Sequence, residues 1–461
     1  MQESELLQKI AQTLQQAQLK TNNQLINYQS ADALSDSLDL NQQAPGDWQA
    51  LFTWVDKYLE YSPNTQHVNF VNRMWSGANP PSIVGEIITA LTNTSSCTFE
   101  SAPVASLMER YMLEQMLEIV GFKNGEGQMT TGSSNANMIA MMVARNQTLT
   151  SAKQKGLFAQ SPLFAFVSED AHYSLDKAAN ILGIGTQNLI KVPTLDSGEM
   201  DTSALDEKIE SIQKEGGIAF FVCATLGTTV RGAYDNITDL LELKQKHNFW
   251  LHGDGAWGGA VIMNEKLKVK FLTDIKQLDS FTMDFHKMLG SNLMCNFLLL
   301  NHQNLLTCTC ADGDNSYIFR EKELDFGVAS LQCGRRVDSL KWFLDWKFYG
   351  KSGFSQRVEN YYQLAIFAEG FINQSDALEM LVERNSFNLC FRFKAKNPNM
   401  FNQKLRDKLL TDEQALLSLA YIKEALVFRL LISNINMDKM KLTALLKRLI
   451  KTGMGLLQKH A

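Results

Sequence analysis

Two short segments carry residues whose types suit covalent chemistry. Asp254 follows an apolar run in Leu-His-Gly-Asp-Gly-Ala-Trp-Gly-Gly, and Lys287 follows a second one in Asp-Phe-His-Lys-Met. A lysine can bond to the aldehyde of pyridoxal 5'-phosphate, and a carboxylate can keep the ring nitrogen of that cofactor protonated. Each residue alone has an ordinary alternative, as a surface lysine and as a turn or helix-cap aspartate. Together they predict a pyridoxal phosphate site.

Candidate phosphate ligands stand at the start of a predicted helix. Gly-Ser-Ser-Asn at 132–135 precedes a helical pattern that runs to Arg145. Free backbone amides and the positive end of a helix dipole attract phosphate, and the hydroxyls of Ser133 and Ser134 add donors. The same residues also suit an ordinary N-cap, so the function of the two serines stays open on this pattern alone.

Both signatures resemble those of the group II pyridoxal-phosphate amino-acid decarboxylases, nearest the glutamate, cysteine-sulfinate and aspartate branch. The resemblance extends from about Asn69 to Asn434, with further blocks in the family's order at 69–77, 98–104, 132–137, 171–174, 224–229, 331–338 and 428–434. It implies pyridoxal 5'-phosphate as cofactor and the conversion of an L-amino acid to its amine and carbon dioxide. It also implies fold type I and a homodimer with a loop contributed across the interface.

The resemblance assigns cofactor contacts to particular residues. His172 matches the family histidine that stacks on the cofactor ring and contacts the substrate carboxylate. Thr229 matches a threonine that lies near the ring on the side of Asp254. The remaining cofactor contacts that it implies are Ser133, Ser134, Asp284 and His286. A histidine after a strand is otherwise usually structural.

Substrate contacts are implied in the same way. Arg429 matches the family arginine that grips the α-carboxylate, for which a planar guanidinium is suited. Tyr317, in the polar, glycine-containing stretch 312–319, matches a lid-loop tyrosine that protonates the α-carbon. Without the resemblance, Arg429 would be read as an ordinary arginine in a strand and Tyr317 as a tyrosine that packs at the edge of a loop.

Arg73 and Cys97 bear on the choice of substrate. The resemblance places Arg73 at a position near the distal end of the substrate, where a cation favours a carboxylate or sulfinate and disfavours a cationic side chain. Its alternative is a structural ion pair. Cys97 replaces an aromatic pocket residue of the family, which leaves the pocket volume open. Aspartate, glutamate and cysteine sulfinate are therefore the expected substrates.

Other functions are compatible with part of the pattern. A decarboxylase of 2,4-diaminobutyrate or of an aromatic amino acid, or an aldehyde synthase, would use the same cofactor and fold. A non-catalytic scaffold should have lost the lysine or the aspartate. A dinucleotide-binding enzyme needs a glycine fingerprint that residues 121–132 do not supply.

The composition narrows the class of protein. The chain has 461 residues, 45% hydrophobic and 20% charged, with a net charge of −5. That charge disfavours nucleic acid and anionic membranes as partners. No stretch of about 18 apolar residues predicts a membrane span, and no apolar leader follows Met1, which favours a cytoplasmic enzyme. The seven cysteines are scattered, and the close pair at 308 and 310 lacks further ligands, so no metal site is expected.

The distribution of apolar residues predicts an α/β fold in three segments. Residues 1–60 carry a narrow helical stripe that must pack on another surface, and the resemblance implies that they form a dimerisation segment. Residues 61–340 alternate strands, at 163–167, 217–222, 249–252 and 296–300, with helices such as 106–120, which predicts a mostly parallel sheet. Residues 341–461 are expected to form a small α/β domain with strands at 389–393 and 427–433.

Overall fold

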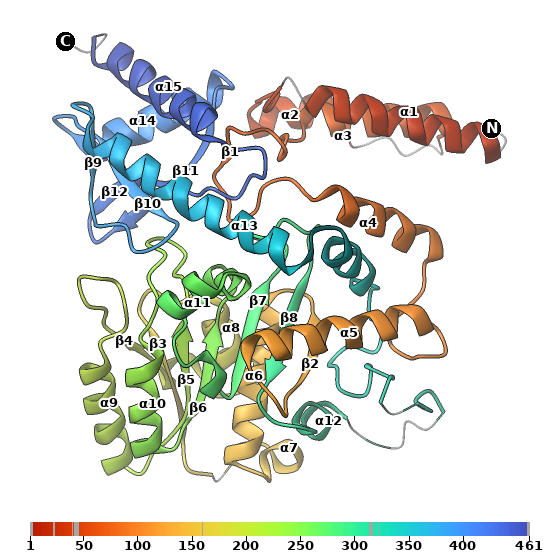
Figure 1. Ribbon diagram of the computed structural model, residues 1–461, viewed down its shortest axis with the longest axis vertical. Coiled ribbons are helices and arrows are strands. Elements are labelled where there is room, and N and C mark those ends of the chain that lie inside the picture. Colours follow the sequence, from red (N-terminus) through yellow and green to blue (C-terminus); the bar gives the residue numbers. More distant parts are fainter. Residues whose placement is uncertain are drawn as a thin grey trace. The chain divides into compact units, whose positions relative to one another are not determined.

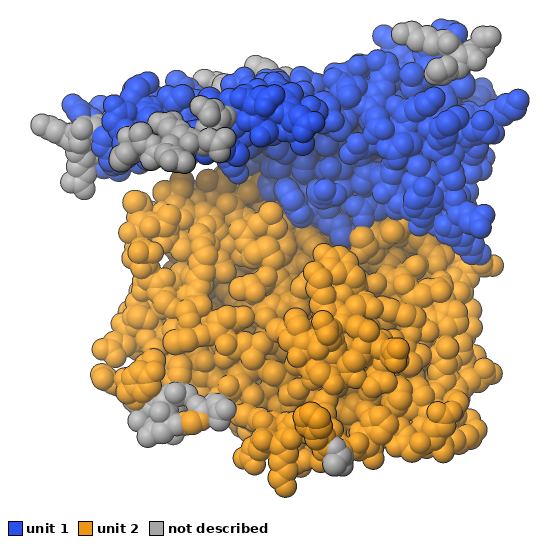
Figure 2. All heavy atoms as spheres, turned by 180° about the vertical axis from the view of Figure 1, so that it is seen from behind, with its two compact units in different colours: residues 1–77, 364–382, 389–461 blue, residues 78–363, 383–388 orange. Residues whose placement is uncertain are grey.

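The computed structural model describes residues 3–21, 24–38, 40, 46–158, 160–311, 313, 317–321 and 323–458 (Figure 1). The chain forms two compact units, coloured separately in Figure 2. Unit 1 comprises residues 1–77, 364–382 and 389–461, and unit 2 comprises residues 78–363 and 383–388. The units are built from interleaved segments, whereas the sequence suggested three consecutive ones.

Unit 2 contains a seven-stranded sheet in the order β2-β8-β7-β6-β5-β3-β4. β8 runs in the direction opposite to that of the other strands of this sheet. The strands predicted from apolar runs are confirmed, with ends that differ by at most three residues. The strands are β2 (Glu126–Thr130), β3 (Leu163–Ser168), β4 (Leu189–Val192), β5 (Ile218–Thr225), β6 (Trp250–Asp254), β7 (Ser280–Asp284) and β8 (Asn296–Leu300).

Helices connect these strands. The predicted helix at 106–120 is α5, which begins earlier because Pro103 suits the first helical turn, and it ends at Gly121 with φ 98°. The helices that begin in unit 2 are α4 (Pro80–Thr92), α5 (Pro103–Val120), α6 (Ser133–Thr148), α7 (Ala152–Lys155), α8 (Ser174–Ile181), α9 (Thr202–Lys214), α10 (Ile237–His247), α11 (Glu265–Phe271), α12 (Leu305–Cys310) and α13 (Ser339–Asn373).

The sheet is buried on both faces, which explains why its strands are almost continuously apolar. Small residues of α6 and α8, such as Ala140 and Ala179, pack with Val167 and Leu298 on one face. Alternate strand residues point to the other face, where the ring of Phe297 stacks on Trp342 at 5.4 Å between centroids. Both layers hold the strand ends in fixed positions.

The strand ends carry the candidate residues. β6 ends at Asp254 and its parallel neighbour β7 ends at Asp284, so both acids lie at one edge of the sheet. β2 runs in the same direction as β7 because β8 is antiparallel to both. The N-terminus of α6, which follows β2, therefore lies at that edge, where ligands of open α/β sheets usually bind.

Unit 1 contains a five-stranded sheet in the order β1-β11-β12-β10-β9. The predicted strand at 389–393 is confirmed as β10, but the one predicted at 427–433 is β12 (Ala425–Leu430), which ends where its pairing with β10 ends at Leu430. The remaining elements are α1 (Glu3–Thr21), α2 (Ala31–Leu38), α3 (Trp48–Tyr61), β1 (Phe70–Val71), β9 (Leu378–Met380), β10 (Leu389–Phe393), α14 (Pro398–Thr411), β11 (Leu416–Ile422) and α15 (Lys439–Gln458). Among the described residues, no helix combines the length and apolar character needed to cross a membrane.

Candidate active site

Asp254, the last residue of β6, is buried and receives a hydrogen bond on each carboxylate oxygen. The side-chain amide of Asn137 in α6 donates to Oδ2 at 2.8 Å, and the backbone amide of Ala256 donates to Oδ1 at 3.0 Å. Hydrogen bonds of this kind stabilise the ionised form of a carboxyl group. Asp254 is thus held in one orientation at the carboxyl edge of the sheet.

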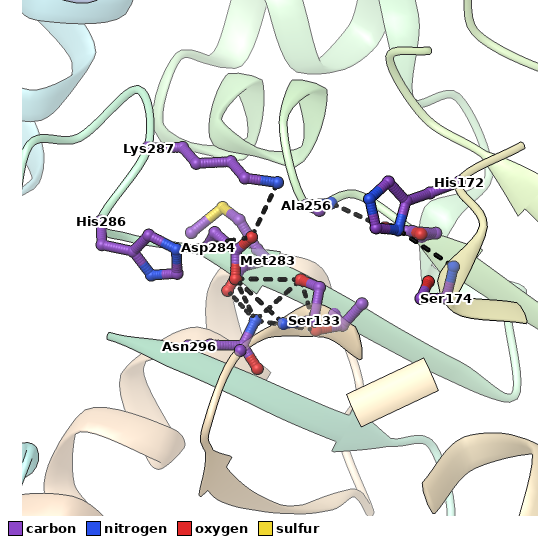
Figure 3. Close-up of polar contacts among 12 residues, drawn as sticks. Ser133, His172, Ser174, Ala256, Met283, Asp284, His286, Lys287 and Asn296 are labelled. Atoms are coloured by element: carbon purple, nitrogen blue, oxygen red, sulfur yellow. Dashed lines mark hydrogen bonds and ion pairs between the residues drawn. The ribbon is translucent and has the colours of Figure 1, made fainter. Parts of the chain in front are cut away.

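Lys287 forms an ion pair with Asp284, the last residue of β7, and Figure 3 shows the amine pointing toward that carboxylate. The lysine Nζ lies 2.9 Å from Asp284 Oδ2. Oδ1 accepts hydrogen bonds from Asn296 Nδ2 at 2.7 Å and from Ser133 Oγ at 3.0 Å. Burial acts to raise the pKa of Asp284, but the charges of Lys287 and His286 hold it below its ordinary value.

The two serines at the start of α6 have different environments. Ser133 is buried and donates to Asp284 through both its backbone amide, at 3.2 Å, and its hydroxyl. Ser134 is exposed at the same helix terminus. The Ser133 donors that the sequence suggested for a phosphate are therefore directed at a carboxylate in this structure, while those of Ser134 face outward.

His172 lies on the loop after β3, near the charges of Asp254, Asp284 and Lys287. Its Nδ1 accepts a hydrogen bond from the backbone amide of Ser174 at 3.2 Å, which leaves the ring proton on Nε2 in the neutral form (Figure 3). Burial lowers the pKa of His172, so the neutral form is favoured. The structure thus brings His172 together with the acids and the lysine.

His286 lies beside Asp284, and Thr229 lies on the loop after β5. His286 is buried. Its Nδ1 lies 2.9 Å from the backbone carbonyl oxygen of Cys295, and its Nε2 lies 3.8 Å from Asp284 Oδ2. Burial lowers the pKa of His286. Thr229 is partly exposed, and its carbonyl oxygen accepts from Asn388 Nδ2 at 3.3 Å.

Two other candidates of unit 2 lie in less regular segments. Tyr317 is 74% exposed, and residues 312 and 314–316 of its loop lie outside the described residues. The Sγ atom of Cys97 is 3.6 Å from that of Cys333, and burial raises the pKa of Cys97 to about 11. Cys97 therefore has a specific thiol neighbour that its sequence context did not suggest.

Arg73 and Arg429 both belong to unit 1. Arg429 on β12 is 8% exposed and donates to Ser418 Oγ at 3.1 Å and to the carbonyl oxygen of Asn72 at 3.2 Å. Burial lowers the pKa of Arg429, and the nearby charge of Arg73 acts in the same direction. Arg73 is exposed and makes no ion pair within the described part of the chain. The structural ion pair considered for Arg73 is thus not found there.

The comparison with known families concerns most of the chain. Residues 32–394 match the family described as pyridoxal-dependent decarboxylase conserved domain. The chain belongs to this family. The decarboxylase therefore uses pyridoxal 5'-phosphate and acts on an amino acid, as the two sequence signatures predicted.

Individual relatives agree with this assignment. The decarboxylase is 35% identical over 376 residues to the acidic amino acid decarboxylase GADL1 of Xenopus tropicalis, covering 80% of this chain and 73% of that protein. It is 36% identical over 372 residues to human cysteine sulfinic acid decarboxylase, covering 79% and 75%. The crystal structure of mouse CSAD in apo form superposes with a TM-score of 0.93 at 30% identity, covering 98% and 99%. The expectation of an α/β enzyme of fold type I is confirmed.

The residues at the strand ends fit the cofactor chemically. A carboxylate that is already hydrogen-bonded at Asp254 suits a protonated ring nitrogen, and the primary amine of Lys287 suits the aldehyde. Exposed donors at the N-terminus of α6, including Ser134, suit a phosphate. These are the three groups of pyridoxal phosphate that a protein must hold.

Sequence reasoning missed Asn137 and Asn296, which donate to the two strand-end acids. Asn137 stands one helical turn after Ser133, a spacing that places both side chains on one face of α6. That spacing, within the Gly-Ser-Ser-Asn-Ala-Asn block, was an available signal. Asn296 gave no such signal, because its partners Ser133 and Asp284 come from other elements.

Proposed function

We propose that the enzyme decarboxylates an acidic L-amino acid, namely aspartate, glutamate or cysteine sulfinate, to the corresponding amine and carbon dioxide. The observation that carries this proposal is the exposed guanidinium of Arg73, which has no ion-pair partner in the described chain and lies near Arg429. A guanidinium recognises a carboxylate or sulfinate through two parallel hydrogen bonds. Relatives named for acidic amino acids and for cysteine sulfinic acid support the same substrate class.

In this proposal, Lys287 would hold the cofactor covalently through its aldehyde, with loss of water, and Asp254 would keep the ring nitrogen protonated. When bound, pyridoxal phosphate withdraws the electrons of the bond that breaks at the α-carbon. Asp284 orients the amine of Lys287, with which it is already paired at 2.9 Å. His172, whose neutral form is favoured, would pack against the ring.

The remaining contacts hold the two ends of the bound molecules. Ser133, Ser134 and His286 would hold the phosphate, and Thr229 would lie beside the ring. Arg429 grips the α-carboxylate of the substrate, which selects the bond to be broken. Cys97 borders the substrate pocket.

We also propose that the enzyme is a cytoplasmic homodimer in which residues 1–60 contact the partner subunit. In this arrangement, Tyr317 reaches the site of the other subunit and returns a proton to the α-carbon. The likeness to mouse CSAD over 98% of this chain supports the same fold for the single subunit.

The test is a panel of substrates. The purified, cofactor-loaded enzyme is incubated separately with aspartate, glutamate, cysteine sulfinate, 2,4-diaminobutyrate and aromatic amino acids, and carbon dioxide and amine are measured. We expect turnover with an acidic substrate. Turnover only of a basic or aromatic substrate would refute the acidic specificity, and aldehyde with ammonia and peroxide would identify an aldehyde synthase.

The contribution of Arg73 is tested within that panel. Arg73→Gln removes the charge and the two-point grip, so we expect KM for the acidic substrate to rise by roughly 10- to 100-fold, the loss of one charge-assisted contact, with a small change in kcat. Arg73→Lys keeps the charge alone and should give an intermediate KM. Equal effects on acidic and neutral substrates would assign Arg73 a structural function.

A further inference from the structure

A chain of buried polar side chains leads away from Asp254 along the sheet. Asn137 Nδ2 donates to Asp254 Oδ2 at 2.8 Å, and Asn137 Oδ1 lies 3.0 Å from His252 Nε2. His252 Nδ1 lies 2.8 Å from Ser280 Oγ, which also accepts from Trp250 Nε1 at 2.8 Å. Asn137, His252 and Ser280 are fully buried.

Strand geometry explains how these residues meet. Side chains alternate between faces along a strand, so Trp250, His252 and Asp254 of β6 point to the same face. Ser280 of β7 is the register partner of His252 on the adjoining strand. Asn137 comes from α6, which packs over this face.

The donor and acceptor types fix the direction of the chain. An indole nitrogen can only donate, so Ser280 Oγ accepts from Trp250. A carboxylate can only accept, so the amide nitrogen of Asn137 must face Asp254. The carbonyl oxygen of Asn137 then faces His252, whose Nε2 must carry a hydrogen.

This arrangement requires a neutral histidine. Burial lowers the pKa of His252 to about 4, even though the charge of Asp254 acts in the opposite direction. With its proton on Nε2, His252 donates to Asn137 and accepts from Ser280, so both ring nitrogens are satisfied. If the Asn137 amide were rotated by 180°, its oxygen would face the Asp254 carboxylate, which is also an acceptor, and its nitrogen would face the His252 N–H, which is also a donor.

We propose that Asn137 and His252 are positioning residues for Asp254: the His252 N–H fixes the orientation of the Asn137 amide, which in turn stabilises the ionised carboxylate that faces the cofactor's ring nitrogen. The inference rests on the function proposed for Asp254 and adds the groups that maintain its charge. Without the Asn137 donor, the carboxylate Oδ2 loses a charge-assisted hydrogen bond in a buried site. The ring nitrogen then holds its proton less firmly.

The experiment measures the ring nitrogen directly. Apo enzyme is reconstituted with pyridoxal phosphate that is ¹⁵N-labelled in the ring, and the nitrogen chemical shift is followed against pH, together with the Kd of the cofactor. In Asn137→Leu and His252→Phe, we expect the ring nitrogen to lose its proton at lower pH than in the wild type. We expect cofactor binding to weaken roughly 10- to 100-fold, because one hydrogen bond to a charged group is lost.

Conservative and control variants separate positioning from folding. His252→Gln keeps an N–H donor for Asn137 and should restore the wild-type nitrogen signal in large part. Thr225 on β5 pairs with Asp254 on β6, and its buried hydroxyl has no hydrogen-bond partner among the described residues; Thr225→Val should therefore leave the signal unchanged. Thermal unfolding of each apo variant shows whether it is folded.

Failure of the inference differs from failure of the proposed function. If Asp254→Asn deprotonates the ring nitrogen but folded Asn137→Leu and His252→Phe keep the wild-type signal, the positioning function is refuted and that of Asp254 stands. If Asp254→Asn itself leaves the nitrogen protonated, the function proposed for Asp254 is refuted, and the positioning function with it.

Discussion

Lys287 and Asp284 show how a buried carboxylate can hold an amine in place, as the covalent function proposed for Lys287 requires. The amine would otherwise sample several rotamers, and the buried carboxylate at 2.9 Å holds it in one place at the strand end. Asp284 is itself held by Ser133 and Asn296. The lysine is therefore oriented by a carboxylate whose own position is fixed by donors from two other elements.

Lys287→Ala tests the covalent bond. Reduction of the loaded wild-type enzyme with borohydride should fix the cofactor to the protein, giving a mass increase of one phosphopyridoxyl group per chain. We expect no increase in Lys287→Ala, because the amine that forms the bond is absent. The control is Lys191→Ala, which removes an exposed lysine paired with Asp176. Attachment in Lys287→Ala would show that another amine carries the cofactor.

His252 should make stability depend on pH in the acid range. Its pKa is lowered from 6.5 to about 4 by burial, so between these values the unfolded chain binds more protons than the folded one. The free energy of unfolding should therefore fall as pH decreases from 6.5 to 4, by up to about 3 kcal/mol from this group.

Comparing the wild type with His252→Gln isolates the contribution of His252 to the free energy of unfolding. Asp235 titrates over the same range with the opposite sign, because burial raises its pKa to about 7. Urea unfolding at several pH values should give a difference between wild type and variant that changes across this range. A constant difference would show that His252 does not titrate between pH 4 and 6.5.

At the scale of elements, β2 is an edge strand that leads directly into the N-terminus of α6. Its outer backbone groups are covered by a buried ion pair, since Glu109 accepts from the amide of Met129 at 3.0 Å and Arg335 donates to the carbonyl oxygen at 3.2 Å. The Nη2 atom of Arg335 lies 2.5 Å from Oε1 of Glu109. The pair thus fixes the strand that positions the candidate phosphate site.

Glu109→Ala should destabilise the enzyme by roughly 3–5 kcal/mol, because Arg335 is left buried without a countercharge. Denaturant unfolding measures the loss. Replacing both partners with apolar residues, Glu109→Leu with Arg335→Met, should recover much of it. Glu114→Ala, which removes an exposed pair with Arg110, should change stability by less than about 1 kcal/mol. A small effect of Glu109→Ala would show that the pair is dispensable.

The sequence predicted elements better than contacts between them. The apolar runs that became β3, β5, β6 and β8 could be located because a parallel sheet buries both faces of its strands. The partners of the acids could not, since Asn137 and Asp254 are 117 positions apart and meet only through the fold. Cys97 is another case, because its neighbour Cys333 is 236 positions away.

At the scale of the whole molecule, the two units are interleaved because a short segment of unit 2 interrupts unit 1. Residues 383–388 belong to unit 2 although they lie between two segments of unit 1. Asn388 accepts from the buried indole of Trp257 at 2.8 Å and donates to the carbonyl oxygen of Val230 at 3.0 Å. These hydrogen bonds tie residues 383–388 to the rest of unit 2, and because unit 1 consists of three segments, no single cut of the chain separates the two units.

The proposed exchange of Tyr317 between subunits can be tested with mixed dimers. Lys287→Ala and Tyr317→Phe are each expected to be inactive. If Tyr317 acts on the partner's site, a mixed dimer contains one site with both changes and one site with neither. Random assembly should then restore about a quarter of the wild-type activity in co-expressed enzyme. No recovery, with mixed dimers verified by mass spectrometry, would place Tyr317 and Lys287 in the same subunit's site.

Helix α6 imposes a strict interval on the sequence between Ser133 and Asn137. Each residue turns an α-helix by about 100°, so an insertion or deletion between them would rotate one donor away from its acid while the other stayed in place. The loops that flank the helix are free of this constraint. Natural variation in length should therefore be absent from these five positions, and a designer who transplants the site must move them as one block.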